Sequence, residues 1–230
     1  MNPFSFKNFI QVAGIIDSKE AQMLIDEGVN FLGFPLRLPV NQEDLTENEA
    51  AEIISSLKPP NYGIVITYSS SAEEALSICN KIGCNIIQLH GDISASELEK
   101  IKKWDPEIVI IKSLVVKEKN ESRLINSLND TKNFVDAYIT DTFDPVTGAS
   151  GATGKTHDWE ISKRLKELSP KPLILAGGLN PTNVYEAIIH VRPAGVDVHT
   201  GVEESSGRKD KELVNNFLQE AWKAFNEIRD

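Results

Sequence analysis

The sequence has 230 residues, a formal net charge of −10 and two cysteines. We expect a single domain over residues 1–230, because α/β barrels commonly fill about 200 to 250 residues as one unit. The acidic excess argues against binding to nucleic acid or to an anionic membrane, since both require positive charge over the contact surface. No apolar run approaches the roughly 20 residues that span a bilayer, and the N-terminus lacks the pattern of a secretory signal.

The cysteines indicate the compartment. Cys79 and Cys84 lie beside apolar residues and are too few for a disulfide framework, which favours a reducing cytoplasm. We therefore expect a cytoplasmic protein in which both thiols are inert residues of the core.

Short apolar runs that are typical of strands alternate with segments in which apolar residues recur at helical spacing. The run 108–111 is apolar at every position, as expected of a parallel strand covered on both faces. Eight such units in a chain of this length predict a closed (β/α)8 TIM barrel rather than an open sheet. The predicted strands are 9–13, 30–34, 62–67, 85–89, 107–114, 135–140, 172–176 and 195–199.

Capping patterns mark several helix starts. Thr46 and Ser94 are each followed three residues later by Glu, and Pro181 after Asn180 predicts a helix that begins with proline at its first position. The polar stretch 142–155 predicts a long loop after the sixth strand.

Polar residues at the carboxyl ends of the predicted strands are candidates for an active site, because the active site of such barrels forms there. Taken alone, each of them is more often a cap or a turn former. Five ionisable groups from four strand ends instead favour one central polar site, and residues two apart on a strand point the same way. The candidates are Gln88, His90, Lys112, Asp141, Asp197 and His199.

Glycines after the last two predicted strands indicate an anion site. Gly177 and Gly178 follow the seventh strand, and Thr200 and Gly201 follow the eighth. Glycine lets backbone N–H groups approach a phosphate closely, and these two loops commonly hold phosphate in barrels. The alternative is that the glycine pair only makes a tight turn.

A relaxed P-loop pattern at residues 149–156 is not expected to bind a nucleotide. A P-loop leaves a strand directly and enters a helix at its Gly-Lys-Thr, whereas here His157, Asp158 and Trp159 precede the helical spacing.

Read together, several strings in chain order resemble phosphoribosylanthranilate isomerase, and the resemblance extends over nearly the whole chain. The strings are IQVAGI at 10–15, LGF at 32–34, QLHG at 88–91, IK at 111–112, TDT at 140–142, GATGKTHDW at 151–159, LAGGLNPTNV at 175–184 and GVDVHTGVE at 195–203.

The resemblance implies a barrel that converts a phosphoribosyl amine into its ketose by an Amadori rearrangement in tryptophan biosynthesis, without cofactor or metal. Asp141 matches the family's general acid, which acts on the ribose ring oxygen. We expect a small phosphorylated sugar substrate, with His199 as a second catalytic residue. We further expect substrate contacts from His90, Lys112, Asp197 and Arg37, and phosphate contacts from Gly177, Gly178, Thr200 and Gly201.

Three positions depart from the family pattern. The cysteine that removes the C2 proton is replaced by Ala13, Glu43 falls near the position of an arginine that pairs with the anthranilate carboxylate, and His199 replaces a serine. Arg37 would restore the carboxylate contact only if its loop takes another path. A methyl group cannot accept a proton, so a displaced base such as His199 or Asp17 is required for the same reaction.

Two alternatives remain open at this point. One is a paralogue that acts on another sugar phosphate, with a divalent metal held by His90, Asp141, Asp197 and His199. The other is a non-catalytic barrel that binds a phosphosugar. The oligomeric state cannot be predicted.

Overall fold

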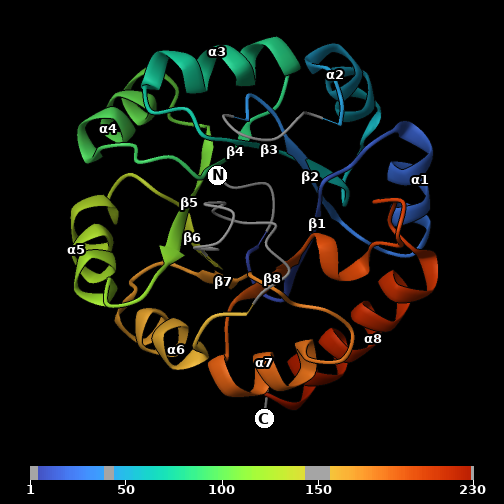
Figure 1. Cartoon of the computed structure of the whole chain (residues 1–230). Coiled ribbons are helices and arrows are strands. Elements are labelled where there is room, and N and C mark those ends of the chain that lie inside the picture. The colour runs from blue at the N-terminus through green and yellow to red at the C-terminus, as the bar shows by residue number, and fades with distance from the viewer. Residues whose placement is uncertain (1–4, 39–43, 143–155, 229–230) are drawn as a thin grey trace.

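The computed structural model describes residues 5–38, 44–142 and 156–228. Eight parallel strands form a closed barrel in the order β1 to β8, and β8 pairs with β1 to complete it (Figure 1). The strands are β1 Phe9–Ala13, β2 Phe31–Pro35, β3 Tyr62–Thr67, β4 Ile86–Leu89, β5 Val109–Val116, β6 Ala137–Thr142, β7 Leu173–Leu175 and β8 Gly195–Val198.

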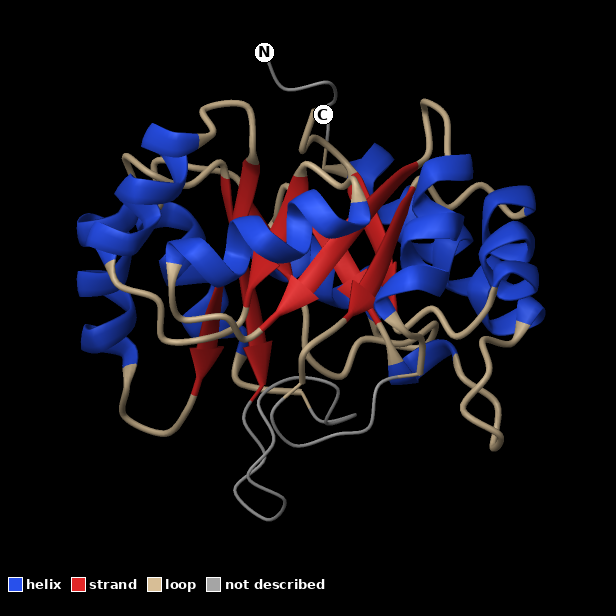
Figure 2. Cartoon of the chain, turned by 90° about the horizontal axis from the view of Figure 1, so that it is seen from above, coloured by secondary structure: helices blue, strands red, loops and turns tan. Residues whose placement is uncertain are grey.

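Helices surround the barrel, and in Figure 2 they flank the central strands. They are α1 Ser18–Asp26, α2 Glu47–Ser56, α3 Ala72–Ile82, α4 Ala95–Trp104, α5 Glu121–Thr131, α6 Trp159–Leu168, α7 Val184–Val191 and α8 Lys211–Glu227, with a short 3₁₀ helix η1 at Thr200–Val202. The predicted TIM barrel is therefore confirmed.

The alternation of side chains decides what faces the barrel interior. Tyr138 on β6 points outward, since its hydroxyl contacts Thr131 Oγ1 on α5 at 2.8 Å. Ile139, the next residue, and Asp141, two residues further on, therefore point inward. On β1, Gln11 contacts Gln88 inside the barrel, so Ala13, two residues further on, has the same orientation.

The predicted helix caps are confirmed at two positions. Thr46 forms a capping box with Glu49, and the Ser94 side chain accepts from Glu97 N. The prediction at Pro181 was wrong, because α7 begins at Val184. Asn180 Oδ1 accepts from Thr182 N at 2.8 Å, and this local hydrogen bond holds the segment as a turn before the helix.

The sixth connection is only partly described. Residues 143–155, which include most of the predicted loop and of the P-loop pattern, lie outside the described residues. Helix α6 begins at Trp159 with Asp158 as its N-cap, so His157 and Asp158 precede the helix as predicted.

Both cysteines are reduced and buried, Cys79 on α3 and Cys84 just before β4. Burial raises the pKa of each thiol, so both resist ionisation, as expected of inert core residues. Among the described helices, none combines the length and the apolar character needed to cross a bilayer.

Candidate active site

Two buried carboxyl groups point into the carboxyl end of the barrel, Asp141 from β6 and Asp197 from β8. Burial raises the pKa of Asp141 to about 7. Burial and the neighbouring charge of Asp141 raise the pKa of Asp197 to about 8. Near neutral pH this pair therefore holds at least one proton, which makes a carboxylic acid available as a proton donor.

A chain of amide and imidazole groups connects the two carboxyl groups. Gln11 Nε2 donates to Gln88 Oε1 at 2.9 Å, and the Gln11 side chain also acts on Asp197, whose pKa it lowers. Gln88 Nε2 lies 2.6 Å from His90 Nε2, and His90 Nδ1 lies 3.8 Å from Asp141 Oδ2. The prediction that Gln88 and His90 share one face is thus confirmed.

Two atoms in this series of side chains have unused hydrogen-bonding capacity. His90 Nδ1 and Asp197 Oδ1 are buried, and neither has a hydrogen-bond partner among the described residues. Burial and the charge of Lys112 lower the pKa of His90 to about 4, so the imidazole is neutral at pH 7. Buried polar atoms normally find a partner, and in the mouth of a barrel that partner is readily a polar ligand.

Lys112 on β5 places a buried cation near His90. Its ammonium Nζ is 3.4 Å from the carbonyl oxygen of Gly91, and burial lowers its pKa. A cation with so weak a contact is suited to pairing with an anionic group of a substrate.

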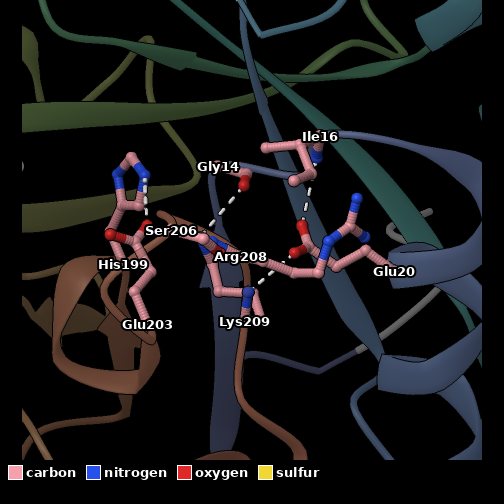
Figure 3. Close-up of polar contacts among 8 residues, drawn as sticks. All are labelled: Gly14, Ile16, Glu20, His199, Glu203, Ser206, Arg208 and Lys209. Carbon is pink, nitrogen blue, oxygen red and sulfur yellow. Dashed lines mark hydrogen bonds and ion pairs between the residues drawn. The ribbon is translucent and has the colours of Figure 1, made fainter.

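The imidazole of His199 lies against Gly14, directly after β1 (Figure 3). A methyl group on Gly14 would be 2.0 Å from His199 Nε2, so only glycine allows the ring this position. The same nitrogen is 3.3 Å from Glu203 Oε1, and that oxygen accepts from Lys209 Nζ at 2.7 Å. Burial and the Lys209 charge lower the pKa of His199 to about 3.

Lys209 and Glu20 join the segment after β1 to the segment after β8. Lys209 Nζ, fully buried, donates to Gly14 O at 3.0 Å, and Lys209 N donates to Glu20 Oε1 at 2.7 Å. Glu20 Oε2 accepts from Ile16 N at 3.1 Å. These contacts fix the backbone beneath His199 (Figure 3).

The glycine-rich loops after β7 and β8 are packed together. Gly177 and Gly178 have φ values of 97° and 65°, which favour glycine. A side chain on Gly201 would lie 1.9 Å from Leu179 O, so the two loops touch through their backbones. Asn183 supports this arrangement by donating to Gly178 O at 3.0 Å.

His157 supports the first of these loops from the side. Its Nδ1 is 2.9 Å from Thr142 Oγ1, and its Nε2 is 2.5 Å from Ser162 Oγ. A methyl group on Gly177 would meet Thr142 Oγ1 at 2.2 Å. The end of β6 and the loop after β7 are therefore in direct contact.

Two candidates make contacts elsewhere. Arg37 donates to Glu47 Oε1 at 2.7 Å on α2 and contacts the carbonyl oxygen of Glu74 on α3. Asp17 caps α1 and accepts from Arg208 at 2.7 Å, and this hydrogen bond lowers its pKa. Both oxygens of this carboxylate therefore already accept hydrogen bonds outside the central polar group. Glu43 lies outside the described residues.

The geometry does not support the hypothesis of a metal site. Across residues 5–38, 44–142 and 156–228, no three His, Cys, Asp or Glu side chains are arranged to hold an ion. His90, Asp141, Asp197 and His199 therefore do not form a ligand set in this arrangement.

Comparison with known sequences assigns the chain to a family. Residues 10–220 match the model of the family described as "N-(5'phosphoribosyl)anthranilate (PRA) isomerase". The chain belongs to this family. An N-(5'-phosphoribosyl)anthranilate isomerase 2 from Methanosarcina mazei is 34% identical over 96% of this chain and 97% of its own length. Its counterpart from Methanothrix thermoacetophila is 31% identical over 91% and 96%.

Solved structures of phosphoribosylanthranilate isomerases are also similar. The enzyme from Thermotoga maritima matches with a TM-score of 0.79 at 28% identity, over 94% of this chain and 99% of that one. A structure of phosphoribosyl anthranilate isomerase in complex with reduced 1-(o-carboxyphenylamino)-1-deoxyribulose 5-phosphate matches with a TM-score of 0.76 at 26% identity, over the same shares.

Within this isomerase family, the site has features that sequence reasoning missed. Gln11, Glu20 and Lys209 were not candidates, although each contacts a candidate residue or its loop. Gln11 could have been found, because it lies two residues before Ala13 on the same face of β1. Glu20 and Lys209 are 189 residues apart, and no local pattern connects them.

Proposed function

We propose that this chain catalyses the isomerisation of N-(5'-phosphoribosyl)anthranilate in tryptophan biosynthesis, as a cytoplasmic enzyme that needs no cofactor. The observation that carries the proposal is the raised pKa of Asp141, about 7, at the position matching the family's general acid. A carboxyl group kept protonated near neutral pH is what the first step requires.

In that step Asp141 donates its proton to the ribose ring oxygen, and the bond from this oxygen to C1 breaks. The electron pair on the substrate nitrogen forms a C=N double bond to C1, which gives an iminium. The positive charge makes the hydrogen on C2 acidic. Asp141 and Asp197 share one buried environment. The proton given to the ribose ring oxygen therefore comes from a buried pair of carboxyl groups.

A base must then take the C2 proton to form an enolamine, which becomes the amino-ketose product. Ala13 has no group for this step. We propose His199 as the base, because its neutral imidazole lies against Gly14, the residue that follows Ala13. With a pKa of about 3 the neutral imidazole is a weak base, so we place its contribution at the lower end of general base catalysis, about 10² in rate.

The remaining candidates bind the substrate in this proposal. Lys112 pairs with an anionic group, His90 donates a hydrogen bond to the substrate from Nδ1, and Asp197 Oδ1 is available for a second substrate hydrogen bond. The phosphate is held by backbone N–H groups of Gly177, Gly178, Thr200 and Gly201. Arg37 remains a prediction for the carboxylate contact.

A fluorescence assay that follows the loss of phosphoribosylanthranilate tests the proposal. We expect turnover by the wild type and a loss of about 10² to 10⁴ in kcat for Asp141→Asn. Asp136→Asn is not a matched control, because Asp136 is bonded to Lys102 and to the backbone of β5. Asp130→Asn is suitable, since Asp130 lies exposed on the outer helix α5. Absence of turnover above buffer, with an active reference enzyme, would reject the proposal.

A further inference from the structure

We infer that Glu203 is a positioning residue that keeps the proton of His199 on Nε2 and so leaves Nδ1 to accept a proton. The inference rests on the proposed function for its substrate. The arrangement of the two side chains stands independently of any substrate.

The first support is that Glu203 is itself held in place. Its Oε1 accepts a 2.7 Å hydrogen bond from Lys209 Nζ, whose side chain is fully buried. Lys209 Nζ also donates to Gly14 O at 3.0 Å, so the ammonium group joins Glu203 to the backbone on which His199 packs. Glu203 therefore has one defined position next to the imidazole (Figure 3).

The second support is the chemistry of the contact. His199 Nε2 lies 3.3 Å from Glu203 Oε1, and a carboxylate oxygen that already accepts from Lys209 can only accept again. A lone pair on Nε2 would face this oxygen unfavourably, whereas an N–H would be attracted to it. The contact consequently favours the neutral tautomer with its proton on Nε2.

The third support is that one edge of the imidazole ring is packed against the backbone. A methyl group on Gly14 would lie 2.0 Å from Nε2, 2.5 Å from Cδ2 and 2.7 Å from Cε1, so this edge of the imidazole is packed against the glycine. Nδ1 lies on the side of the ring away from Glu203 (Figure 3). Among the described residues no group hydrogen-bonds to Nδ1, and the side chain is 25% exposed.

The Lys209 charge explains why the imidazole stays neutral beside a carboxylate. Lys209 balances the charge of Glu203, and together with burial it lowers the pKa of His199 to about 3. Glu203 therefore acts by orienting a neutral ring, much as a third group orients the base in other catalytic arrangements.

Nitrogen NMR of protein labelled with ¹⁵N-histidine tests the inference without a substrate. The chain has four histidines, His90, His157, His190 and His199, and His199→Gln identifies the signals of the last. We expect the wild-type signal of His199 to show a protonated Nε2 and an unprotonated Nδ1 between pH 6 and 8. A protonated Nδ1 in the wild type would overturn the inference.

Glu203→Gln is the matching variant, because the amide keeps the shape of the side chain but is a weaker acceptor than a carboxylate. We expect it to move the His199 signals toward the other tautomer. Glu204→Gln is the control, since it removes the same charge one residue away, where the carboxylate accepts from Ser206. Equal signals in both variants would overturn the inference. If Glu203→Gln does not fold, the double variant Glu203→Leu, Lys209→Met removes both buried charges together and should likewise shift the His199 signals, whereas an unchanged Nε2 proton would overturn the inference.

Kinetics separate this inference from the proposed function. For an active wild type, Glu203→Gln should lower kcat about 10- to 100-fold and change KM less than about threefold, as when the partner that orients a functional imidazole is lost. A rise in KM with kcat unchanged would contradict a positioning role. An inactive wild type with the expected tautomer would reject the proposed reaction and leave the His199–Glu203 relationship standing.

Discussion

Gln11 Nε2 on β1 donates a 2.9 Å hydrogen bond to Gln88 Oε1 on β4, so two side chains meet inside the barrel. This bond decides the orientation of the Gln88 amide. With its oxygen accepting from Gln11, the amide nitrogen donates to His90 Nε2 at 2.6 Å. The proton of neutral His90 is therefore on Nδ1, the nitrogen nearer Asp141.

Gln88→Leu should destabilise the protein by about 1 to 3 kcal/mol, because Gln11 and His90 would lose a buried partner. Urea unfolding measures this change. Gln219→Leu is the control, since Gln219 hydrogen-bonds Asn215 on the exposed side of α8 and should change stability by less than about 0.5 kcal/mol. Equal effects of the two substitutions would mean that the internal chain of amides adds nothing to stability.

The rate should fall as pH rises through about 7. Asp141 must be protonated to act as an acid, and its pKa is about 7. His199 must be neutral to act as a base, and its pKa of about 3 keeps it neutral over the whole working range. We expect kcat/KM to be level between about pH 5 and 6 and to fall tenfold per pH unit well above 7. A profile that rises between pH 6 and 8 would contradict these roles.

Asp141 should also make stability depend on pH. Its pKa is raised from 3.8 to about 7 by folding, so the folded protein binds the proton more tightly than the unfolded chain. The stabilising effect is fully present below about pH 4 and is lost as pH rises toward 7. Asp141→Asn has no such proton, so relative to the wild type it should gain at least about 1 kcal/mol between pH 4 and pH 8. Unfolding of both proteins at each pH measures the difference, and a constant difference would refute the raised pKa.

A thiol at position 13 should compensate for the loss of His199. His199→Gln is expected to lower kcat about 10²-fold. Ala13 faces the barrel interior at the end of β1, and adding Ala13→Cys to that variant should recover activity at least about tenfold. Ala13→Ser is the control, because a hydroxyl group is a far weaker base than a thiolate. No recovery, with both proteins folded, would indicate that the C2 proton does not lie between these two positions.

The loop after β7 should tolerate no side chain at Gly177. Gly177→Ala would place a methyl group 2.2 Å from Thr142 Oγ1 and would strain a φ of 97°, so we expect KM to rise at least about tenfold. Gly207→Ala separates the two effects, because Gly207 also has positive φ, 84°, but its methyl group would meet nothing within 4 Å. It should cost about 1 kcal/mol of stability and leave KM unchanged. Similar KM values for the two variants would argue against the phosphate assignment.

The barrel could be predicted from the sequence because its signals are local. Apolar strands alternate with helical spacing, and caps such as Thr46 and Ser94 mark helix starts. The predicted start of the seventh helix failed for an equally local reason. The side chain of Asn180 bonds Thr182 N, and this turn competes with the helix that Pro181 would otherwise begin.

The site could be predicted only in part. That Asp141, Asp197 and His90 lie together could be predicted because strand ends converge in a barrel, a rule that needs no coordinates. Their protonation depends on burial, and the contact of Lys209 with Gly14 joins residues 195 apart in the sequence. A sequence pattern indicates neither the protonation of these groups nor the contact between Lys209 and Gly14. The close approach of His199 to Gly14 likewise depends on the pairing of β8 with β1.

That pairing also determines when the site is completed during folding. His199, Glu203 and Lys209 follow the last strand, whereas Gly14, which His199 and Lys209 contact, follows the first. During synthesis the first connection emerges long before its counterpart exists. Closing this contact requires nearly the whole chain to be in place, and such long-range contacts are the slow steps of folding. A nascent chain that ends just before Lys209 thus has all eight strands but not the ammonium group that holds Glu203 beside His199.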